Sequence, residues 1–434
     1  MRIKSSLLAL AIMQLAISTS ASAQTDTETL AKNVDAKVLA WRRDIHQFPE
    51  LGNREFRTSK LVADHLKKLG LTVKTGIGHT GVVAILKGDK PGPRIAIRAD
   101  MDALPVTERS TLPFASKQTT EFRGEKVGVM HACGHDSHTA MLMGVAEAMV
   151  AMKKDLKGEV MFIFQPAEEG PPDGETGGAP AMLADGLFKD YKPQAIFGLH
   201  VWSALNAGQV GYRSGPAMAA SDRFRIVVKG RQTHGSRPWG GVDPIVTAAD
   251  IVSTAQTIVS RRMDISRLPV VVSFGAIKGG IRYNIIPDEV ELIGTIRTFD
   301  EGMRQQVFAE LKSIAQHVAA AHGATVVSEV PDTIGNPATV NNAELTARSV
   351  PSLIKAAGAD NVVNMSLVMG AEDFSYYANE VPGFFFFVGA TPVGQDAATA
   401  PSNHSPEFFL DESALKVGTR SLLQVTLDYL NQTP

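Results

Sequence analysis

The chain has 434 residues, of which 44% are hydrophobic and 20% are charged, so it can bury a large core and is long enough for two domains. Its formal net charge of −2 gives no electrostatic sign of nucleic acid or an anionic membrane as a partner, and we expect neither. The sequence shows no heptads and no repeat of fixed period, which argues against repeat architectures.

The first 23 residues read as a secretory signal peptide. Arg2 and Lys4 precede an apolar run over residues 7–17, and Ala21-Ser22-Ala23 supplies small residues at the spacing of a cleavage site. We expect cleavage after Ala23 and a periplasmic or secreted mature protein. The run is too short to span a membrane, and no later segment has the roughly 18 uninterrupted apolar residues that a spanning helix needs.

Strands and helices alternate through the first half of the mature chain. Amphipathic helices are expected over 29–48 and 55–69, a further helix over 139–152, and apolar strands over 81–88, 93–105, 159–165 and 195–201. This order predicts an α/β fold with a mostly parallel sheet and helices on both faces. In such folds the functional site lies at the carboxyl ends of the strands.

The stretch HACGHDSHTA, residues 131–140, contains the only cysteine, Cys133, and three of the eleven histidines. A lone cysteine is most often a buried and inert thiol, and an exported protein normally uses cysteines in pairs. Here Gly134 lets the backbone approach another group closely, and Asp136 could orient an imidazole. A bound metal would keep the thiol as a thiolate and protect it from oxidation. We therefore predict a metal site around Cys133 and the histidines His131, His135 and His138.

Further candidate ligands follow predicted strands. Glu168 and Glu169 come directly after strand 159–165, His200 ends strand 195–201, and His404 lies in the loop SNHSPEF. Taken singly, each has a simpler explanation: a solvated acidic loop, a core histidine with a satisfied hydrogen bond, and an exposed histidine. Adjacent carboxylates also fit a division of labour, in which one binds a cation and the other accepts a proton from metal-bound water.

Six motifs occur in order over nearly all of the mature chain: HACGHDSH, FQPAEEG, GLHV, HGSRPWGGVDP, MGAEDFSYY and NHSPEF. Together they resemble the hippurate hydrolase and auxin-conjugate hydrolase branch of the aminoacylase and carboxypeptidase metallohydrolases. The resemblance implies hydrolysis of the amide bond of N-acyl amino acids at a site with two divalent metal ions. It makes Glu168 the general base and implies five metal ligands, which are Cys133, His135, Glu169, His200 and His404.

Two features of this centre are less firmly implied. The wider superfamily has a His-x-Asp turn where this chain has Asp100-Met101-Asp102, and we expect Asp100 and Asp102 to support the ligands rather than to bind metal. Mixed sulfur, nitrogen and oxygen ligands suit zinc best, although manganese, cobalt or nickel could occupy the same positions.

Residues 216–330 read as an insert. Strands are expected over 223–230, 270–279, 288–298 and 324–330, with helices over 243–262 and 301–322. This β-α-β-β-α-β order is ferredoxin-like. The catalytic domain is then discontinuous, over residues 24–215 and 331–434. The resemblance implies that the insert is a lid, which in many relatives also forms a homodimer.

Three residues of the insert are candidate substrate contacts. The resemblance places His234 where a histidine polarises the scissile carbonyl, sometimes from a partner subunit. Asn284 and Arg297 could hold the substrate carboxylate, since a planar guanidinium suits bidentate pairing. An arginine near a strand end is more often simply exposed.

Two alternatives stay open. The protein could be an exported metallo-carboxypeptidase or dipeptidase acting on short peptides, which differs only in substrate. It could also be a non-catalytic binding protein for amino-acid conjugates, although loss of a ligand or of the base would mark such a protein and neither is lost here. The sequence does not determine the acyl group.

Overall fold

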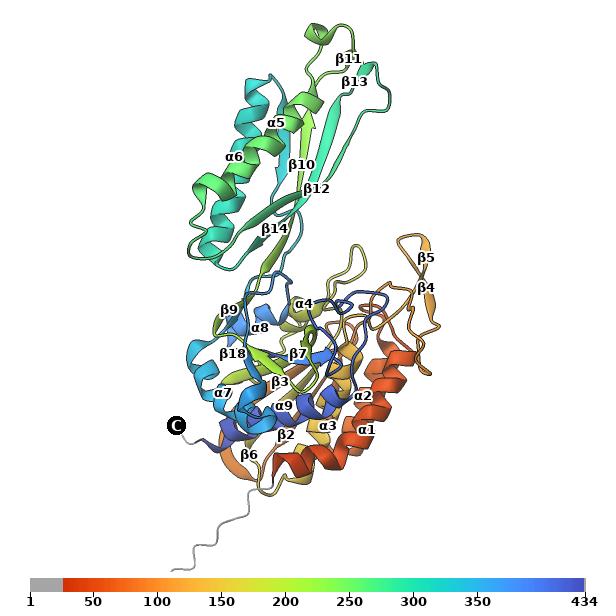
Figure 1. Cartoon of the computed structure of the whole chain (residues 1–434), viewed down its shortest axis with the longest axis vertical. Coiled ribbons are helices and arrows are strands. Elements are labelled where there is room, and N and C mark those ends of the chain that lie inside the picture. Colours follow the sequence, from red (N-terminus) through yellow and green to blue (C-terminus); the bar gives the residue numbers. More distant parts are fainter. Residues whose placement is uncertain (1–25, 433–434) are drawn as a thin grey trace, which may run out of the picture.

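The computed structural model describes residues 26–432, so the expected signal peptide lies outside the described residues. Two lobes are visible in Figure 1. The larger, lower lobe is built from both ends of the described chain, and the smaller, upper lobe is built from its middle. None of the helices within residues 26–432 combines the length and apolarity needed to cross a membrane.

An eight-stranded sheet forms the centre of the lower lobe, in the order β1-β2-β6-β3-β7-β18-β8-β17. The four central strands β6, β3, β7 and β18 run parallel to one another, and β8 is parallel to β17. The pairs β1–β2, β2–β6 and β18–β8 are antiparallel. The bounds are β1 Thr72–Ile77, β2 Gly81–Lys87, β3 Lys90–Asp100, β6 Lys157–Gln165, β7 Ala195–Asn206, β8 Val210–Tyr212, β17 Val362–Asn364 and β18 Gly383–Thr391.

The sheet is therefore mixed, because the expected parallel strands form its centre and antiparallel pairs lie on both sides of them. The reason is the short connection between consecutive strands. Only residues 78–80 separate β1 from β2, and only residues 207–209 separate β7 from β8. A loop this short can reverse the chain but cannot make the crossover that parallel pairing needs.

Helices cover both faces of this sheet because alternate residues of each strand point to opposite sides. Along β3, Ile95 and Ile97 pack in the same core cluster as residues of α1, α2, α3, α7 and α9, whereas Ala96 packs with residues of α4 and α8. The bounds are α1 Thr27–Gln47, α2 Phe56–Lys68, α3 His135–Ala151, α4 Gly178–Ala184, α7 Ala343–Ala357, α8 Phe374–Glu380 and α9 Ser413–Asn431. Fourteen of the 17 residues of α3 are buried, which makes it the central helix of this layer.

The upper lobe has a sheet and a core of its own. Its strands pair antiparallel in the order β12-β14-β10-β15, and two helices pack on them. In chain order the elements are β10 Ala220–Lys229, α5 Pro244–Thr257, β12 Val271–Gly279, β14 Glu289–Thr298, α6 Glu301–Ala321 and β15 Thr325–Glu329. The helix expected over 243–262 is divided, since a π-helical turn, Ile258–Arg262, follows α5.

Short elements complete the fold. A two-stranded ribbon of β11 Thr233–His234 and β13 Ile285–Ile286 lies at the end of the upper lobe that is far from the lower lobe (Figure 1). A hairpin of β4 Thr119–Phe122 and β5 Glu125–Gly128 stands on the lower lobe and faces the upper one. β9 Gly215–Met218 pairs with β16 Thr339–Asn341, where the chain passes between the lobes. Two 3-10 turns, Pro238–Gly240 and Ala359–Asn361, are also present.

Candidate metal centre

The five expected metal ligands converge from four separate segments of the lower lobe. Cys133 lies in the loop before α3 and His135 is the first residue of that helix, while His200 belongs to β7, Glu169 follows β6, and His404 lies in the loop between β18 and α9. Gly134 joins the first two in a left-handed conformation, with φ of 91°. A Cβ atom there would lie 2.3 Å from a methyl group of Val201, so only glycine fits this turn.

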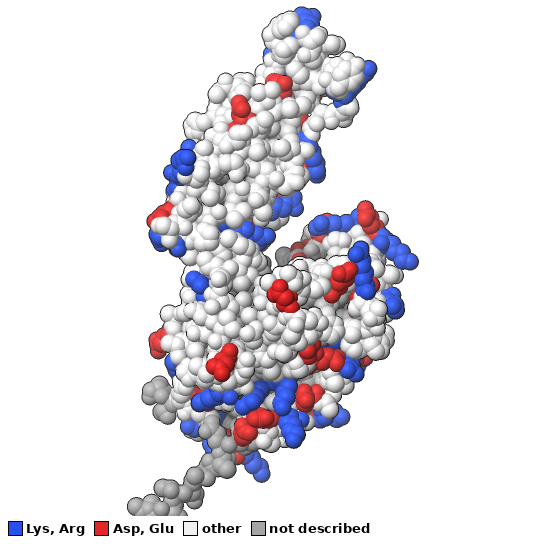
Figure 2. Space-filling view, viewed as in Figure 1, with Lys and Arg blue, Asp and Glu red and all other residues white. Residues whose placement is uncertain are grey.

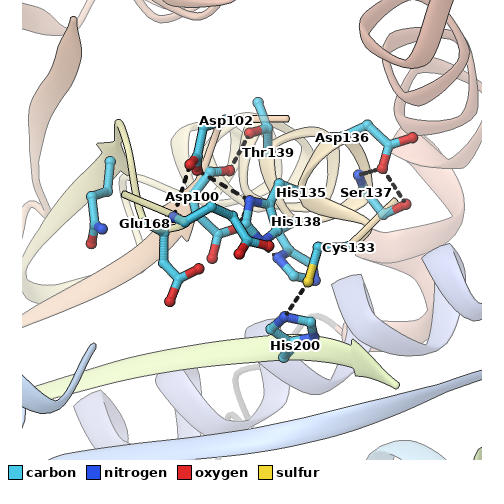
Figure 3. Close-up of polar contacts among 12 residues, drawn as sticks. Asp100, Asp102, Cys133, His135, Asp136, Ser137, His138, Thr139, Glu168 and His200 are labelled. Carbon is cyan, nitrogen blue, oxygen red and sulfur yellow. Dashed lines mark hydrogen bonds and ion pairs between the residues drawn. The ribbon is translucent and has the colours of Figure 1, made fainter. Parts of the chain in front are cut away.

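The sulfur of Cys133 lies at the centre of the group. It is 3.3 Å from Nε2 of His200, as drawn in Figure 3, and 3.1 Å from Nε2 of His404. Two triads form around it, one with His135 and His200 and the other with Glu169 and His404, and within each triad the ligand atoms lie within 4.8 Å of one another. Because Cys133 belongs to both triads, one sulfur could bridge two cations.

The two buried histidines present lone pairs to this space. The Nδ1–H of His200 donates to the carbonyl of Val201 at 2.7 Å, and Nδ1 of His135 lies 3.2 Å from a carboxylate oxygen of Asp102. Both rings therefore turn Nε2 toward the sulfur side. Nε2 of His135 is buried and has no hydrogen-bond partner among the described residues, which is costly unless a cation takes the lone pair.

Charges around the sulfur also fit a cation. Burial, with Glu169 and Glu168 next in importance, raises the pKa of Cys133 well above its usual value. Burial likewise lowers the pKa of His200 well below its usual value. Without a metal the sulfur would thus be a neutral thiol among carboxylates. A bound divalent cation would hold it as thiolate, and the sulfur, imidazole and carboxylate donors suit zinc or a similar transition metal.

Glu168 lies beside the two triads but belongs to neither. Its carboxylate groups with His135 and Glu169 on one side and with Glu372 and Asp373 on the other. Its Oε1 accepts a hydrogen bond from the backbone N–H of Asp373 at 3.3 Å. Burial, followed by the charge of Glu372, raises the pKa of Glu168 well above its usual value. A carboxylate of raised pKa is a better proton acceptor near neutral pH.

Asp102 contacts two of the candidate ligands, and Asp100 contacts His138. Asp102 faces His135 and also accepts the backbone N–H of Glu169 at 2.9 Å, so it orients one ligand from α3 and one from the loop after β6. Asp100 lies 2.6 Å from Nδ1 of His138, whose Nε2 accepts the N–H of Val201 at 2.8 Å. Both nitrogens of His138 are thus engaged, which leaves none for a metal.

Asp136 differs from its expected role. It orients an imidazole, but that ring belongs to His46 of α1, at 2.7 Å, and Arg42 lies 3.0 Å away. Asp136 follows His135 by one helical position, which turns its side chain about 100° away from the ligand side. Figure 3 shows it pointing away from Cys133. Asp136 therefore holds α3 against α1 and contacts none of the candidate ligands.

A cavity of about 490 Å³ opens onto the sulfur and lies between the lobes, where the surface in Figure 2 is hollowed. The lower lobe supplies Cys133, Glu168 and Trp202 to its lining, and the upper lobe supplies Arg297 from the end of β14. Arg297 is half-buried and forms no ion pair or side-chain hydrogen bond with any residue of the range 26–432. Burial lowers its pKa. An unpaired guanidinium at this position is suited to binding an anionic group.

His234 and Asn284 lie elsewhere. Both are in the ribbon of β11 and β13 and the turn leading to it, at the far end of the upper lobe (Figure 1). His234 is exposed, and its Nδ1 accepts the N–H of Ser236 at 3.1 Å. The structure does not bring either residue into the cavity of its own chain.

Two further buried acidic groups lie near the centre and were not among the predicted site residues. Arg98 of β3 is fully buried, and its Nη2 lies 2.9 Å from both Glu372 and Asp373. Glu55, also fully buried, accepts the backbone N–H of Ala167 at 2.8 Å and so supports the turn that carries Glu168. The sequence did hold a signal for Glu372 and Asp373. Arg98 lies inside an apolar strand, and a buried arginine needs carboxylate partners.

Comparison with known proteins matches the chain to one family. Residues 96–428 match the model of peptidase family M20/M25/M40. Thermostable carboxypeptidase 2 of Saccharolobus solfataricus is 40% identical over 92% of this chain and 97% of its own length. N-acyl-L-amino acid amidohydrolase of Geobacillus stearothermophilus is 41% identical over 69% of this chain and 77% of its own.

Among solved structures, one similar chain is the YXEP protein of Bacillus subtilis, which is described as a dinuclear metal binding peptidase from the M20 family. It matches this chain with a TM-score of 0.74 and 35% sequence identity. The match covers 92% of this chain and 99% of that one.

Proposed function

The chain belongs to peptidase family M20/M25/M40 and is a hydrolase acting on amides, and from this premise we propose that it cleaves the amide bond of N-acyl amino acids. One observation carries the proposal. Cys133 is shared by two metal-ligand triads, Glu168 lies beside them, and the unpaired Arg297 lines the same cavity. The place for a carboxylate and the place for an amide are therefore in one cavity.

Arg297 supplies the reason to favour a substrate with a free carboxylate. In an N-acyl amino acid the carboxylate is one carbon away from the scissile amide nitrogen. A half-buried guanidinium with no carboxylate of its own can pair with that group, and the low polarity of the site strengthens the pair. We assign the substrate carboxylate to Arg297 and the acyl carbonyl to the cation side of the cavity.

The ligands are proposed as the five residues that converge on the sulfur, with zinc as the first choice of metal. Two cations bound there would polarise the carbonyl and make a water molecule acidic. Glu168 would accept the proton of the attacking water and return it to the leaving amine nitrogen, because its carboxylate lies beside the candidate ligands and belongs to neither triad.

The upper lobe is proposed as a lid and as the dimerisation surface. His234 and Asn284 lie too far along this lobe to serve the cavity of their own chain, so we propose that they act in a homodimer, on the site of the partner subunit. There the imidazole of His234 would donate to the developing oxyanion. Export through residues 1–23 is likewise part of the proposal.

A second candidate is a carboxypeptidase acting on short peptides, favoured by the 40% identity to a carboxypeptidase over nearly the whole length of both chains. Hydrolysis of N-acyl amino acids and hydrolysis of short peptides would use the same residues of the protein. The substrates differ only in the group on the carbonyl side of the scissile amide. A peptide presents a charged or acylated amino terminus and further amides, whereas an N-acyl amino acid presents a plain acyl group.

A substrate panel tests the proposal. The metal-loaded protein is incubated with hippurate, N-acetyl amino acids and dipeptides, and the released amino acid is measured. We expect release from the N-acyl amino acids. Glu168→Gln should lower kcat by a factor of about 10² to 10⁴, while elemental analysis finds its metal content unchanged. Release from dipeptides alone would favour the second candidate, and no release from any substrate would leave only a binding protein.

A further inference from the structure

The turn that carries Glu168 and Glu169 has an unusual backbone. Ala167, the residue before Glu168, has φ of 50°, in the left-handed region that residues other than glycine seldom adopt. The N–H of Gly170 donates to the carbonyl of Ala167 at 3.3 Å and closes the turn. Two residues with proposed roles therefore follow a backbone conformation that is disfavoured unless other contacts hold it.

The buried side chain of Glu55 provides such a contact. Its Oε1 accepts the N–H of Ala167 at 2.8 Å, and its Oε2 accepts the hydroxyl of Thr80 in the turn between β1 and β2. We infer that Glu55 is a positioning residue, which holds Ala167 in the left-handed conformation and so keeps Glu168 and Glu169 at the metal centre. This inference rests on the roles proposed above for these two glutamates.

Glu55 lies at the start of α2 but does not cap that helix. It occupies the N-cap position, where a polar side chain commonly accepts backbone N–H groups of the first turn, and its side chain makes no such bond. Glu50 accepts the N–H groups of Arg57 and Thr58 instead. The carboxyl group of Glu55 is therefore available to a turn that lies 112 residues further along the chain.

A role in stability alone explains Glu55 poorly. Its carboxyl group is fully buried and forms no ion pair with a cationic side chain of residues 26–432. Burial of a carboxyl group without a cationic partner costs free energy, so an apolar side chain of similar size would suit a purely structural position better. The hydrogen bond to Ala167 gives this carboxyl group a reason to lie beside the centre.

Two glycines make room for the side chain of Ala167, which is 2% exposed. A Cβ atom added to Gly52 or to Gly177 would lie 3.0 Å from the Cβ of Ala167. Packing therefore determines where the methyl group of Ala167 lies, and Glu55 determines where its N–H points. Together these contacts compensate for the unfavourable φ of the residue.

Buried carboxyl groups hold the backbone on both sides of Glu168. Glu55 binds the N–H of Ala167, and Asp102 accepts the N–H of Glu169 at 2.9 Å. Asp102 also faces His135, so its replacement would disturb a second ligand. Glu55 has no hydrogen bond to a side chain of the candidate ligands in the described part of the chain, and its replacement therefore tests the turn by itself.

The first measurement uses Zn²⁺ as the probe and needs no substrate. Competition with a chelator gives the Kd of Zn²⁺ for the unmodified protein and for Glu55→Ala. We expect this Kd to rise about 10- to 100-fold, the usual effect of losing a group that orients a metal ligand, because Glu169 is no longer held in place. In the metal-loaded protein kcat should fall by a similar factor, and KM should change less.

Further variants separate positioning from stability. Glu55→Gln keeps an oxygen for the N–H of Ala167 and should retain the Kd and kcat of the unmodified protein. Ala167→Gly combined with Glu55→Ala should recover most of both losses, because glycine adopts the left-handed conformation without a steric penalty. If Glu55→Ala does not fold, Glu55→Asp shortens the side chain by one carbon and should change Kd and kcat in the same direction.

Asp428→Ala is the matched control. Asp428 is a buried carboxylate of α9 that accepts the hydroxyl of Ser352 at 2.7 Å. Its replacement should lower the free energy of unfolding, measured by urea denaturation, and leave the Kd of Zn²⁺ and kcat unchanged. A general loss of stability is thereby distinguished from a displaced turn.

Three results would overturn the inference. The first is an unchanged Kd and kcat in Glu55→Ala, and the second is a loss in Glu55→Gln as large as that in Glu55→Ala. The third is an equal loss with and without Ala167→Gly, since the conformation of Ala167 would then not be what Glu55 maintains. Failure of the proposed function looks different, because the protein would bind Zn²⁺, respond to Glu55→Ala in its Kd, and release no amino acid from any substrate.

Discussion

The two lobes hold their candidate functional residues in opposite ways. In the lower lobe, Cys133, His135 and His200 are buried, and their polar atoms are oriented by backbone groups and by Asp102. In the upper lobe, His234 is exposed at the far end, whereas Arg297 lines the cavity. The candidate ligands of the lower lobe are thus preorganised by local packing. The contribution of the upper lobe to the site depends instead on where that lobe lies relative to the lower one.

This difference separates two kinds of dependence. Buried ligands depend on local packing, so a substitution there should change metal content whatever the oligomeric state. Residues of the upper lobe depend on where that lobe lies, or on a second subunit, so a substitution there should change kcat or KM while metal content is retained. The following predictions test this division, from the largest expected effect to the smallest.

The largest effect is expected at the shared sulfur. Cys133→Ser should lose both metals because the residue belongs to both triads, and kcat/KM should fall by about a thousandfold or more. His404→Ala should lose one metal and retain the other, since His404 belongs to one triad only. Elemental analysis and kinetics on the same preparations measure this. Retention of both metals by Cys133→Ser would contradict the bridging role.

His234→Ala should lower kcat by about a hundredfold, the cost of removing one donor to an oxyanion, with metal content unchanged. If His234 serves a partner subunit, mixing this variant with Glu168→Gln should restore activity, because a mixed dimer contains one complete site. His317→Ala, at an exposed histidine of α6, is the control. Failure of the mixture to regain activity after subunit exchange would argue against a shared site.

Arg297→Ala should raise KM by about 10- to 100-fold, the loss of a hydrogen-bonded charge pair, with a smaller change in kcat. The effect should disappear for a substrate whose carboxylate is replaced by a carboxamide. Arg282→Ala, at an exposed arginine of the upper lobe, should leave KM unchanged. An equal rise in KM for the carboxylate and carboxamide substrates would remove Arg297 from carboxylate binding.

The smallest effect is expected on stability, at Glu55. Burial, and then the charge of Asp102, raises the pKa of Glu55 from 4.5 to about 8. The folded protein therefore holds a proton that the unfolded chain releases, so the stabilisation is fully present below pH 4.5 and is lost as pH rises toward about 8.

Glu55→Gln should remove this dependence, since its amide oxygen can still accept the N–H of Ala167. In metal-free protein, the free energy of unfolding should fall less steeply with pH between 5 and 8, by at most about 1.4 kcal/mol per pH unit for one group. Urea denaturation at several pH values measures it. Glu380→Gln, at an exposed glutamate, should follow the unmodified protein.

Much of the lower lobe could be predicted from the sequence because its signals are local. The apolar strands 159–165 and 195–201 lead directly to Glu168, Glu169 and His200, and strand ends meet at one edge of a sheet. The mixed sheet was missed because apolar runs show which segments are strands without showing the direction in which neighbours pair. Asp136 was misplaced because one helical position decides which side a residue faces.

Positions in the upper lobe could not be predicted in the same way. His234, Asn284 and Arg297 lie within one ferredoxin-like order of elements, yet only Arg297, at the end of β14 near the lower lobe, reaches the cavity. The distance of each of these residues from the metal centre depends on which end of a strand it lies near and on which end of that strand faces the lower lobe. That register is a long-range property, and the alternating pattern of β14 is compatible with either direction.

The lower lobe is built from both ends of the described chain, and this affects the order in which the protein can fold during synthesis. β18 lies between β7 and β8, and the hydroxyl of Thr27 in α1 donates to Gln424 of α9. The central sheet therefore stays incomplete until β18, Gly383–Thr391, has been synthesised. Residues 220–329 are contiguous and have their own core, so we expect the upper lobe to fold first and the amidohydrolase centre to assemble last.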